Sequence, residues 1–178
     1  MKTAAIVVGG LLVAALAWFF FFNNDSSRHQ LAAPSPVAQP APAPAVRHTD
    51  LPNMLLLKTD GSRETAKNIE GKAMLVLFQP DCDHCQREAV QIREHLPAFQ
   101  GYTLYFISDA PPAQLAKFAQ EYKLGNEPNI HFAQTSLESI LNHFGPVDAP
   151  SVFIYSDEGR LKKSFIGETP IDQILPHI

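Results

Sequence analysis

Two cysteines separated by two residues, Cys82 and Cys85, are the residues of this chain best suited to chemistry, and they are its only cysteines. Side chains three residues apart lie on one face of a helix, so the two thiols can meet. At a helix N-terminus, unpaired backbone N–H groups and the helix dipole would stabilise the thiolate of Cys82, which is the attacking form. Cys85, one turn further along, is then placed to resolve a mixed disulfide.

The charged neighbours of the pair act on the Cys82 thiolate in opposite directions. His84 favours the thiolate when it is protonated, whereas Asp81 and Asp83 disfavour it. Glu88, three residues after Cys85, is a candidate to assist the second thiol; the alternative is a solvated residue on the helix face. His84, Asp83 and Glu88 are therefore the candidates for tuning the thiol pKa values.

A structural disulfide and a zinc site are the two other uses of such a cysteine pair. A disulfide across so short a loop would constrain the unfolded chain little. A structural zinc ion takes four ligands, and His84, lying between the only two cysteines, is unsuited to complete such a site. A redox-active dithiol, Cys82–Cys85, is the favoured interpretation, and no metal is assigned.

The cysteine pair lies where a short apolar strand is followed by a helix. Residues 74–78 predict a buried strand, residues 79–81 end it, and a helix is expected from Cys82 to Leu96, before Pro97. Further strands are expected at 54–58, 63–66, 102–108, 129–132, 151–156 and 161–166, and further helices at 109–122, 137–144 and 170–177. This alternation, with a hairpin at each end, predicts a mixed α/β layered domain over residues 51–178.

The first 50 residues differ in composition from the rest. Residues 4–22 are uncharged and almost all apolar, and they are long enough to span a hydrocarbon core of about 30 Å. Because this run ends in Trp and Phe rather than in small residues, an uncleaved N-terminal membrane anchor is expected rather than a cleaved signal peptide. Lys2 predicts a cytoplasmic N-terminus. The Pro/Ala-rich residues 23–50 predict an extended linker.

The formal net charge of −4 argues against nucleic acid as a partner. With the N-terminus in the cytoplasm, residues 51–178 would face the periplasm or another extracytoplasmic space of a bacterium, as a single-pass protein of the inner membrane. Membrane lipid, through residues 4–22, is then an expected partner.

The motifs in residues 51–178 resemble the thioredoxin fold, and within it the membrane-tethered TlpA/ResA-like thiol-disulfide oxidoreductases of bacteria, of the redoxin or AhpC-TSA superfamily. The resemblance rests on the hairpin ending at Gly71-Lys72, the Cys82–Cys85 motif after a strand, Glu88, and Ala149-Pro150 before a later strand. It implies a three-layer fold in which helices flank a central mixed sheet. It also implies that Pro150 is a cis-proline facing the dithiol, where the backbone of Ala149 meets an incoming peptide.

The sequence departs from this family pattern at several positions. Asp81 replaces the aromatic residue before the first cysteine, and Val76 replaces the buried acid of thioredoxins six residues before it. Val90 replaces a common helix proline, and Asp83-His84 replaces Gly-Pro between the cysteines. A histidine at position 84 resembles the oxidising branch of the superfamily, where it stabilises the reduced form. These departures leave the direction of electron flow open.

The expected function is that of a protein-disulfide oxidoreductase without a dissociable cofactor. Its expected substrates are exported proteins with thiols or disulfides, for which apocytochromes and copper-site proteins are family precedents, and an upstream redox partner would lie in the membrane or periplasm. A peroxiredoxin-like peroxidase is one alternative, but it requires Thr or Ser where this chain has Gln79. A copper chaperone is another, which would add His131 or His143 to the two cysteines.

Overall fold

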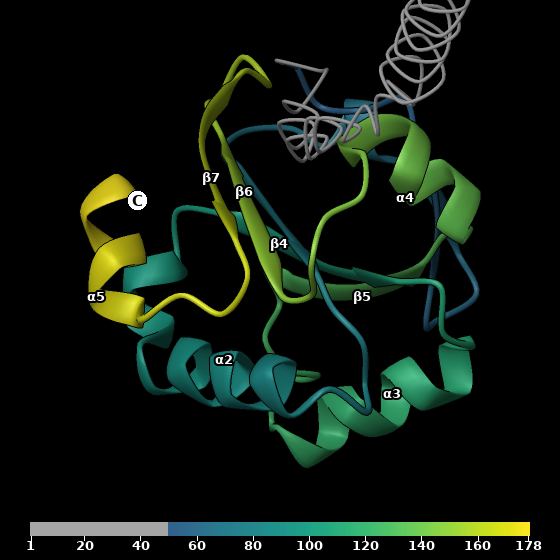
Figure 1. Cartoon of the computed structure of the whole chain (residues 1–178), viewed down its shortest axis with the longest axis horizontal. Helices are drawn as coiled ribbons and strands as arrows, with labels where there is room; N and C mark the ends of the chain where they lie inside the picture. The colour runs from purple at the N-terminus through teal and green to yellow at the C-terminus, as the bar shows by residue number, and fades with distance from the viewer. Residues whose placement is uncertain (1–49) are drawn as a thin grey trace, which may run out of the picture. The chain divides into compact units, whose positions relative to one another are not determined.

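Seven strands form one mixed sheet in the computed structural model, which describes residues 50–178 (Figure 1). The strand order is β2-β1-β5-β4-β3-β6-β7. The central strands β3, β4 and β5 are parallel, and every other pair of neighbours is antiparallel. The bounds are β1 Leu55–Lys58, β2 Arg63–Thr65, β3 Ala73–Leu77, β4 Thr103–Ser108, β5 Ile130–Gln134, β6 Ser151–Tyr155 and β7 Leu161–Ile166.

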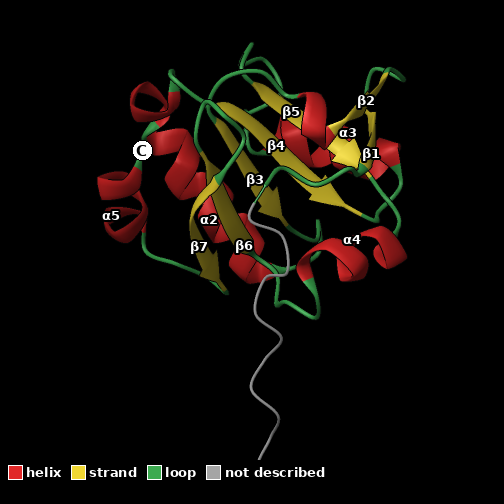
Figure 2. Ribbon diagram, turned by 90° about the horizontal axis from the view of Figure 1, so that it is seen from above, coloured by secondary structure: helices red, strands yellow, loops and turns green. Residues whose placement is uncertain are grey.

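Helices cover both faces of this sheet and complete three layers (Figures 1 and 2). One face packs against α2 (Asp83–Glu94), α3 (Pro112–Glu121) and the short α5 (Ile171–Ile174). The opposite face packs against α4 (Leu137–Phe144) and residues of the N-terminal hairpin. The expected three-layer, thioredoxin-like α/β fold is therefore what the structure has over these residues.

Strand β3 explains why an uninterrupted apolar run precedes the cysteines. All five of its residues are buried, because the strand is central and has helices on both sides. Met74 and Val76 face the side of α2 and α3, while Leu75 and Leu77 face the side of α4. β3, which leads to the Cys82 segment, is thus packed between two hydrophobic cores.

The expected elements agree with the structure except at some of their ends. α2 stops at Glu94, two residues earlier than expected, and a 3-10 turn at Leu96–Phe99 takes up Pro97. β5 runs on to Gln134 because it pairs with both β4 and β1. The expected helix at 170–177 is a single α-turn followed by a 3-10 turn at Leu175–His177, since Pro176 cannot continue the α-helical hydrogen bonds.

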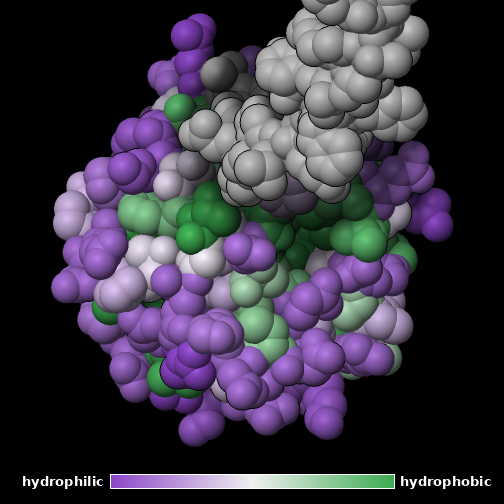
Figure 3. All heavy atoms as spheres, in the orientation of Figure 1, coloured by the Kyte–Doolittle hydropathy of each residue, from purple (hydrophilic) through white to green (hydrophobic). Residues whose placement is uncertain are grey.

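Among residues 50–178, no helix combines the length and the apolar character needed to cross a bilayer. The predicted anchor at 4–22 and all but the last residue of the predicted linker at 23–50 lie outside the described residues. On the face shown in Figure 3, hydrophilic residues cover most of the surface over α2 and α3. These two helices therefore bury one side and present a polar outer side.

Candidate active site

Strand register brings distant segments of the chain to the carboxyl end of β3. β6 runs antiparallel to β3 with Ser151 opposite Leu77, so the preceding Pro150 lies beside the start of the Cys82 segment. The Ala149–Pro150 peptide bond is cis, and Pro150 is buried. β7 pairs with β6 so that Ile166 lies opposite Ser151, which carries the following residues, 167–169, to the same edge of the sheet.

Cys82 is the N-cap residue of α2, and its side chain is half-buried. Its Sγ accepts a hydrogen bond from the backbone N–H of Cys85 at 3.3 Å. The same sulfur lies 3.7 Å from the carbonyl oxygen of Ala149, to which the thiol donates. The sulfur therefore accepts one hydrogen bond and donates another. Cys82 is thus in contact with both the helix N-terminus and the cis-proline loop.

Cys85 is buried beneath Cys82, and both thiols are free. Burial is the main cause that raises the pKa of the Cys85 thiol, and its interaction with Cys82 raises the pKa further. The backbone N–H of Gln79 donates to Cys85 Sγ at 3.5 Å and acts in the opposite direction. Cys85 therefore requires a proton acceptor to become nucleophilic near neutral pH.

Glu88 lies on the inner side of α2 and is 1% exposed, so its interpretation as a solvated surface residue is wrong. Its Oε2 accepts a hydrogen bond from the backbone N–H of Thr169 at 3.5 Å, while Oε1 is buried without a partner. Burial raises the pKa of Glu88 to about 7, although the Thr169 N–H opposes the shift. This carboxyl group can therefore gain and release a proton near neutral pH, on the same helix as Cys85.

His84, between the two cysteines, is hydrogen-bonded through its Nδ1 to the carboxylate of Glu168. Arg87 donates from Nε and Nη2 to the two oxygens of Glu168 at 2.7 Å each, and its Nη2 lies 2.6 Å from His84 Nδ1. The bonds from Arg87 and then His84 lower the pKa of Glu168 to about 2. These three residues, called here the Glu168 cluster, tie the segment after β7 to the first turns of α2.

Arg87, Glu168 and Thr169 were not among the residues predicted from the sequence. A signal for them was present in the hairpin at 151–166. Pairing its two strands across the Asp157-Glu158-Gly159 turn places the residues after Ile166 beside Pro150.

Asp83, a predicted tuning residue, is exposed at the first position of α2. It lines an open groove of about 600 Å³ that also borders Arg87, Tyr122 and Glu168.

Gln79 occupies the position where a peroxiredoxin-like peroxidase would need a hydroxyl group, and its side chain is hydrogen-bonded to other residues. Its amide nitrogen donates to Asp109 Oδ1 at 2.6 Å, and its amide oxygen accepts from Ser108 Oγ at 3.1 Å. These bonds join the segment after β3 to the end of β4. The Gln79 side chain is thus occupied in holding the loop before Cys82.

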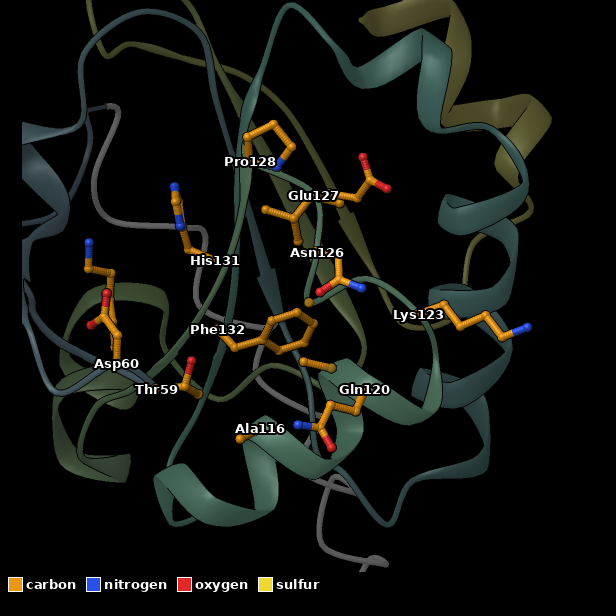
Figure 4. Close-up of a pocket in the computed structure, with 14 residues that line it drawn as sticks. Thr59, Asp60, Ala116, Gln120, Lys123, Asn126, Glu127, Pro128, His131 and Phe132 are labelled. Carbon is orange, nitrogen blue, oxygen red and sulfur yellow. The ribbon is translucent and has the colours of Figure 1, made fainter.

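The two histidines considered as copper ligands lie in other surroundings. His131 packs its ring 4.9 Å from that of Tyr105 and lines a hollow of about 570 Å³ with Asp60 and Lys123, to which neither cysteine contributes (Figure 4). His143 Nδ1 lies 2.8 Å from the carbonyl oxygen of Ser139 within α4. Within residues 50–178, no three His, Cys, Asp or Glu side chains are grouped so that they could hold a metal ion.

Comparison with known proteins establishes the family. A model of the AhpC/TSA family matches residues 48–164. The chain belongs to this family. No curated protein sequence matches the chain.

Solved structures similar to this member of the AhpC/TSA family include three kinds of protein. A secreted Mycobacterium tuberculosis disulfide oxidoreductase homologous to Escherichia coli DsbE has 17% identity and a TM-score of 0.56, with 70% of this chain and 93% of that chain covered. ScoI of Arabidopsis thaliana with copper bound has 16% identity and a TM-score of 0.58, with 72% and 94% covered. A peroxiredoxin-like protein from Aquifex aeolicus has 14% identity and a TM-score of 0.62, with 75% and 86% covered.

At these identities the similar structures establish a thioredoxin-like redoxin fold. Disulfide oxidoreductases, a copper-binding protein and a peroxiredoxin-like protein share that fold. The choice among these activities therefore rests on the residues around Cys82 and Cys85.

Proposed function

We propose that this chain is a thiol-disulfide oxidoreductase that acts on cysteines of other proteins. The observation that carries the proposal is the placement of Cys82. Its half-buried sulfur caps α2 and touches the carbonyl group of Ala149 next to a cis-proline, while Cys85 is buried one turn behind it. Cys82 is thus accessible to a substrate, whereas Cys85 is buried and would react with Cys82 in the second step.

The reaction follows from this order of exposure. The thiolate of Cys82 attacks a substrate disulfide, which forms a mixed disulfide and releases one substrate thiolate. Cys85, as a thiolate, then attacks Cys82 Sγ, which forms the Cys82–Cys85 disulfide and releases the second substrate thiolate. Two electrons pass to the substrate, and the released thiolates take up two protons. The same steps in reverse oxidise a substrate dithiol.

Glu88 is proposed as the group that accepts the proton from Cys85. The buried thiol requires such a group, and Glu88 is buried on the same helix with a pKa of about 7. Its unpartnered Oε1 leaves one oxygen free for this role, either directly or through a water molecule.

Ala149 and Pro150 are proposed to contact the substrate backbone. Pro150 lacks an N–H group and adds little bulk, so a peptide could lie along the carbonyl side of this loop beside Cys82. Ile166 is 49% exposed and lies opposite Ser151, where it can offer an apolar surface to the same peptide.

The cellular setting is part of the proposal and rests on the N-terminal sequence. The apolar residues 4–22 would anchor the chain in the bacterial inner membrane, and the Pro/Ala-rich residues that follow would hold the domain in the periplasm. Exported proteins with thiols or disulfides, among them apocytochromes or copper-site proteins, would then be its substrates. A redox partner in the membrane or periplasm would reset the dithiol.

The first test is thiol trapping of the purified full-length chain after equilibration in glutathione buffers of different poise. We expect a reversible Cys82–Cys85 couple. A potential of about −120 to −200 mV would place the protein with oxidants or isomerases, and one near about −270 mV or below would make it a reductant. The absence of a reversible couple would refute the proposal, and binding of one equivalent of copper(I) would then favour a copper chaperone.

The second test separates the roles of the two cysteines. Cys85→Ser should accumulate a long-lived mixed disulfide on Cys82, because the resolving thiol is missing, whereas Cys82→Ser should not. The measurement is capture of substrate adducts on a non-reducing gel, followed by their release with reductant. Equal trapping by the two variants would contradict the assignment of attacking and resolving thiols.

A further inference from the structure

The Glu168 cluster lies at the dithiol, yet neither step of the proposed reaction uses it. Glu168 follows Gly167, whose φ of +83° lies in the left-handed region and turns the chain after β7. Thr169, the next residue, donates its backbone N–H to Glu88. Glu168 is therefore held between a glycine turn and a buried hydrogen bond, with its side chain directed at α2.

His84 Nδ1 faces a donor and an acceptor at the same time. With a proton on Nδ1, the ring donates to Glu168, and without it, the ring accepts from Arg87. In both states the ring stays attached to the ion pair between Arg87 and Glu168. The residue between the two cysteines is thus tied to a carboxylate that lies 84 positions away in the sequence.

Arg87 connects this cluster electrostatically to Cys82. Its pKa is raised chiefly by the hydrogen bonds to Glu168 and further by the negative charges of Glu168, Asp83 and the Cys82 thiolate. Cys82 is the N-cap of α2 and Arg87 lies near the start of the same helix, so the sulfur and the guanidinium group are at the same end of α2. A carboxylate that neutralises Arg87 weakens the support that Arg87 can give to the thiolate.

We infer that Glu168 is a positioning residue of the dithiol, which holds His84 and Arg87 in ion pairs and so withholds their positive charge from the Cys82 thiolate. The inference rests on the proposed function and assigns a residue that sets the redox poise. It also gives a physical reason why a histidine between the cysteines need not make this protein a strong oxidant. The reduced form is favoured less than His84 alone would favour it.

The test is Glu168→Gln in the full-length chain, with Asp172→Asn as the matched control. The glutamine side chain keeps the shape and one acceptor oxygen but loses the charge, while Asp172 is an exposed acid on the neighbouring α5. The measured quantity is the equilibrium constant for oxidation of the dithiol by glutathione disulfide. We expect Glu168→Gln to lower it about two- to five-fold, in the range of exposed charge pairs, because the cluster is open to solvent.

The same Glu168→Gln substitution, made in a chain that lacks His84, isolates the contribution of His84. In a His84→Ala chain, the change caused by Glu168→Gln should be smaller, since only Arg87 is then released. An unchanged or raised constant in Glu168→Gln, or an equal change in Asp172→Asn, would overturn the inference. A Glu168 that only held the loop in place would alter unfolding but leave this constant unmoved.

A further measurement keeps the inference separate from the proposed function. The rate of alkylation of the reduced protein by iodoacetamide reports the thiolate fraction of Cys82 and needs no reversible disulfide. The pH profile for Glu168→Gln should move to lower pH than that of the unsubstituted chain. If the unsubstituted chain has no reversible couple, the proposed function fails, and this profile still decides the role of Glu168.

Discussion

Replacement of Glu88 by Gln tests the electrostatics of the buried side of α2. Glutamine is close in shape to protonated Glu88 and can still accept the N–H of Thr169. It cannot ionise. In the folded protein burial raises the pKa of Glu88 to about 7, from its ordinary value of 4.5. Between these two values the folded chain holds a proton on Glu88 that the unfolded chain has released.

The sign of the effect follows from this difference in bound protons. The free energy of unfolding falls as pH rises from 4.5 through about 7, and the loss levels off above about pH 8. The difference between 4.5 and about 7 corresponds to about 3 kcal/mol, since each pH unit is worth about 1.4 kcal/mol. Of this amount, about 2 to 3 kcal/mol should develop between about pH 5 and about pH 8.

The assay is denaturant unfolding of reduced chains at a series of pH values, with Glu94→Gln as the control. Glu94 is an exposed acid on the same helix. Relative to the unsubstituted chain, Glu88→Gln should gain stability steadily as pH rises, whereas Glu94→Gln should show no such trend. An unpaired amide group at position 88 would shift all values equally and leave the slope intact. Parallel stability curves for Glu88→Gln and the unsubstituted chain would refute the assignment of a raised pKa to Glu88.

Two further predictions concern the scaffold. Ser136→Ala should lower the free energy of unfolding by about 1 kcal/mol, because the Ser136 hydroxyl caps α4 by accepting the Ser139 N–H at 3.1 Å; denaturant titration measures this loss, and an unchanged midpoint would contradict it. Phe106→Ala should cost about 3 to 5 kcal/mol, because its buried ring stacks 4.8 Å from that of Phe132. Leu55→Ala, at a side chain 57% exposed, should lower the free energy of unfolding far less in the same assay. Equal losses of stability in the two variants would contradict a main contribution of the Phe106 ring to core packing.

The elements that hold the cysteines could be predicted because their signals are local. The apolar run of β3, the breaker residues after it and the proline after α2 lie within a few residues of the boundaries they set. α4 is predicted to the residue, since Ser136 marks its start and Gly145, with φ of +77°, marks its end.

The electrostatic partners of the site could not be predicted in the same way. The contact of Glu168 with His84 joins positions 84 apart, and only the antiparallel register of β6 and β7 brings them together. Glu88 looked equally suited to a solvated surface, because helix periodicity alone does not state which face α5 and the segment after β7 will cover. Burial by non-local elements decides the protonation of Glu88, so its role emerged only from the fold.

Segment 167–169 carries one carboxylate, Glu168, and donates a hydrogen bond to another, Glu88, and the pKa values of these two groups are shifted in opposite directions. On its outer side, Glu168 has a pKa lowered to about 2 and stays charged beside the helix end that carries Cys82. On its inner side, the Thr169 N–H meets Glu88, whose pKa near 7 is raised in part by the charge of Glu168. Removing the charge of Glu168 should therefore act on both thiols at once, through the cationic groups beside Cys82 and through the proton acceptor proposed for Cys85. Segment 167–169 is thus proposed to influence both the attacking and the resolving step.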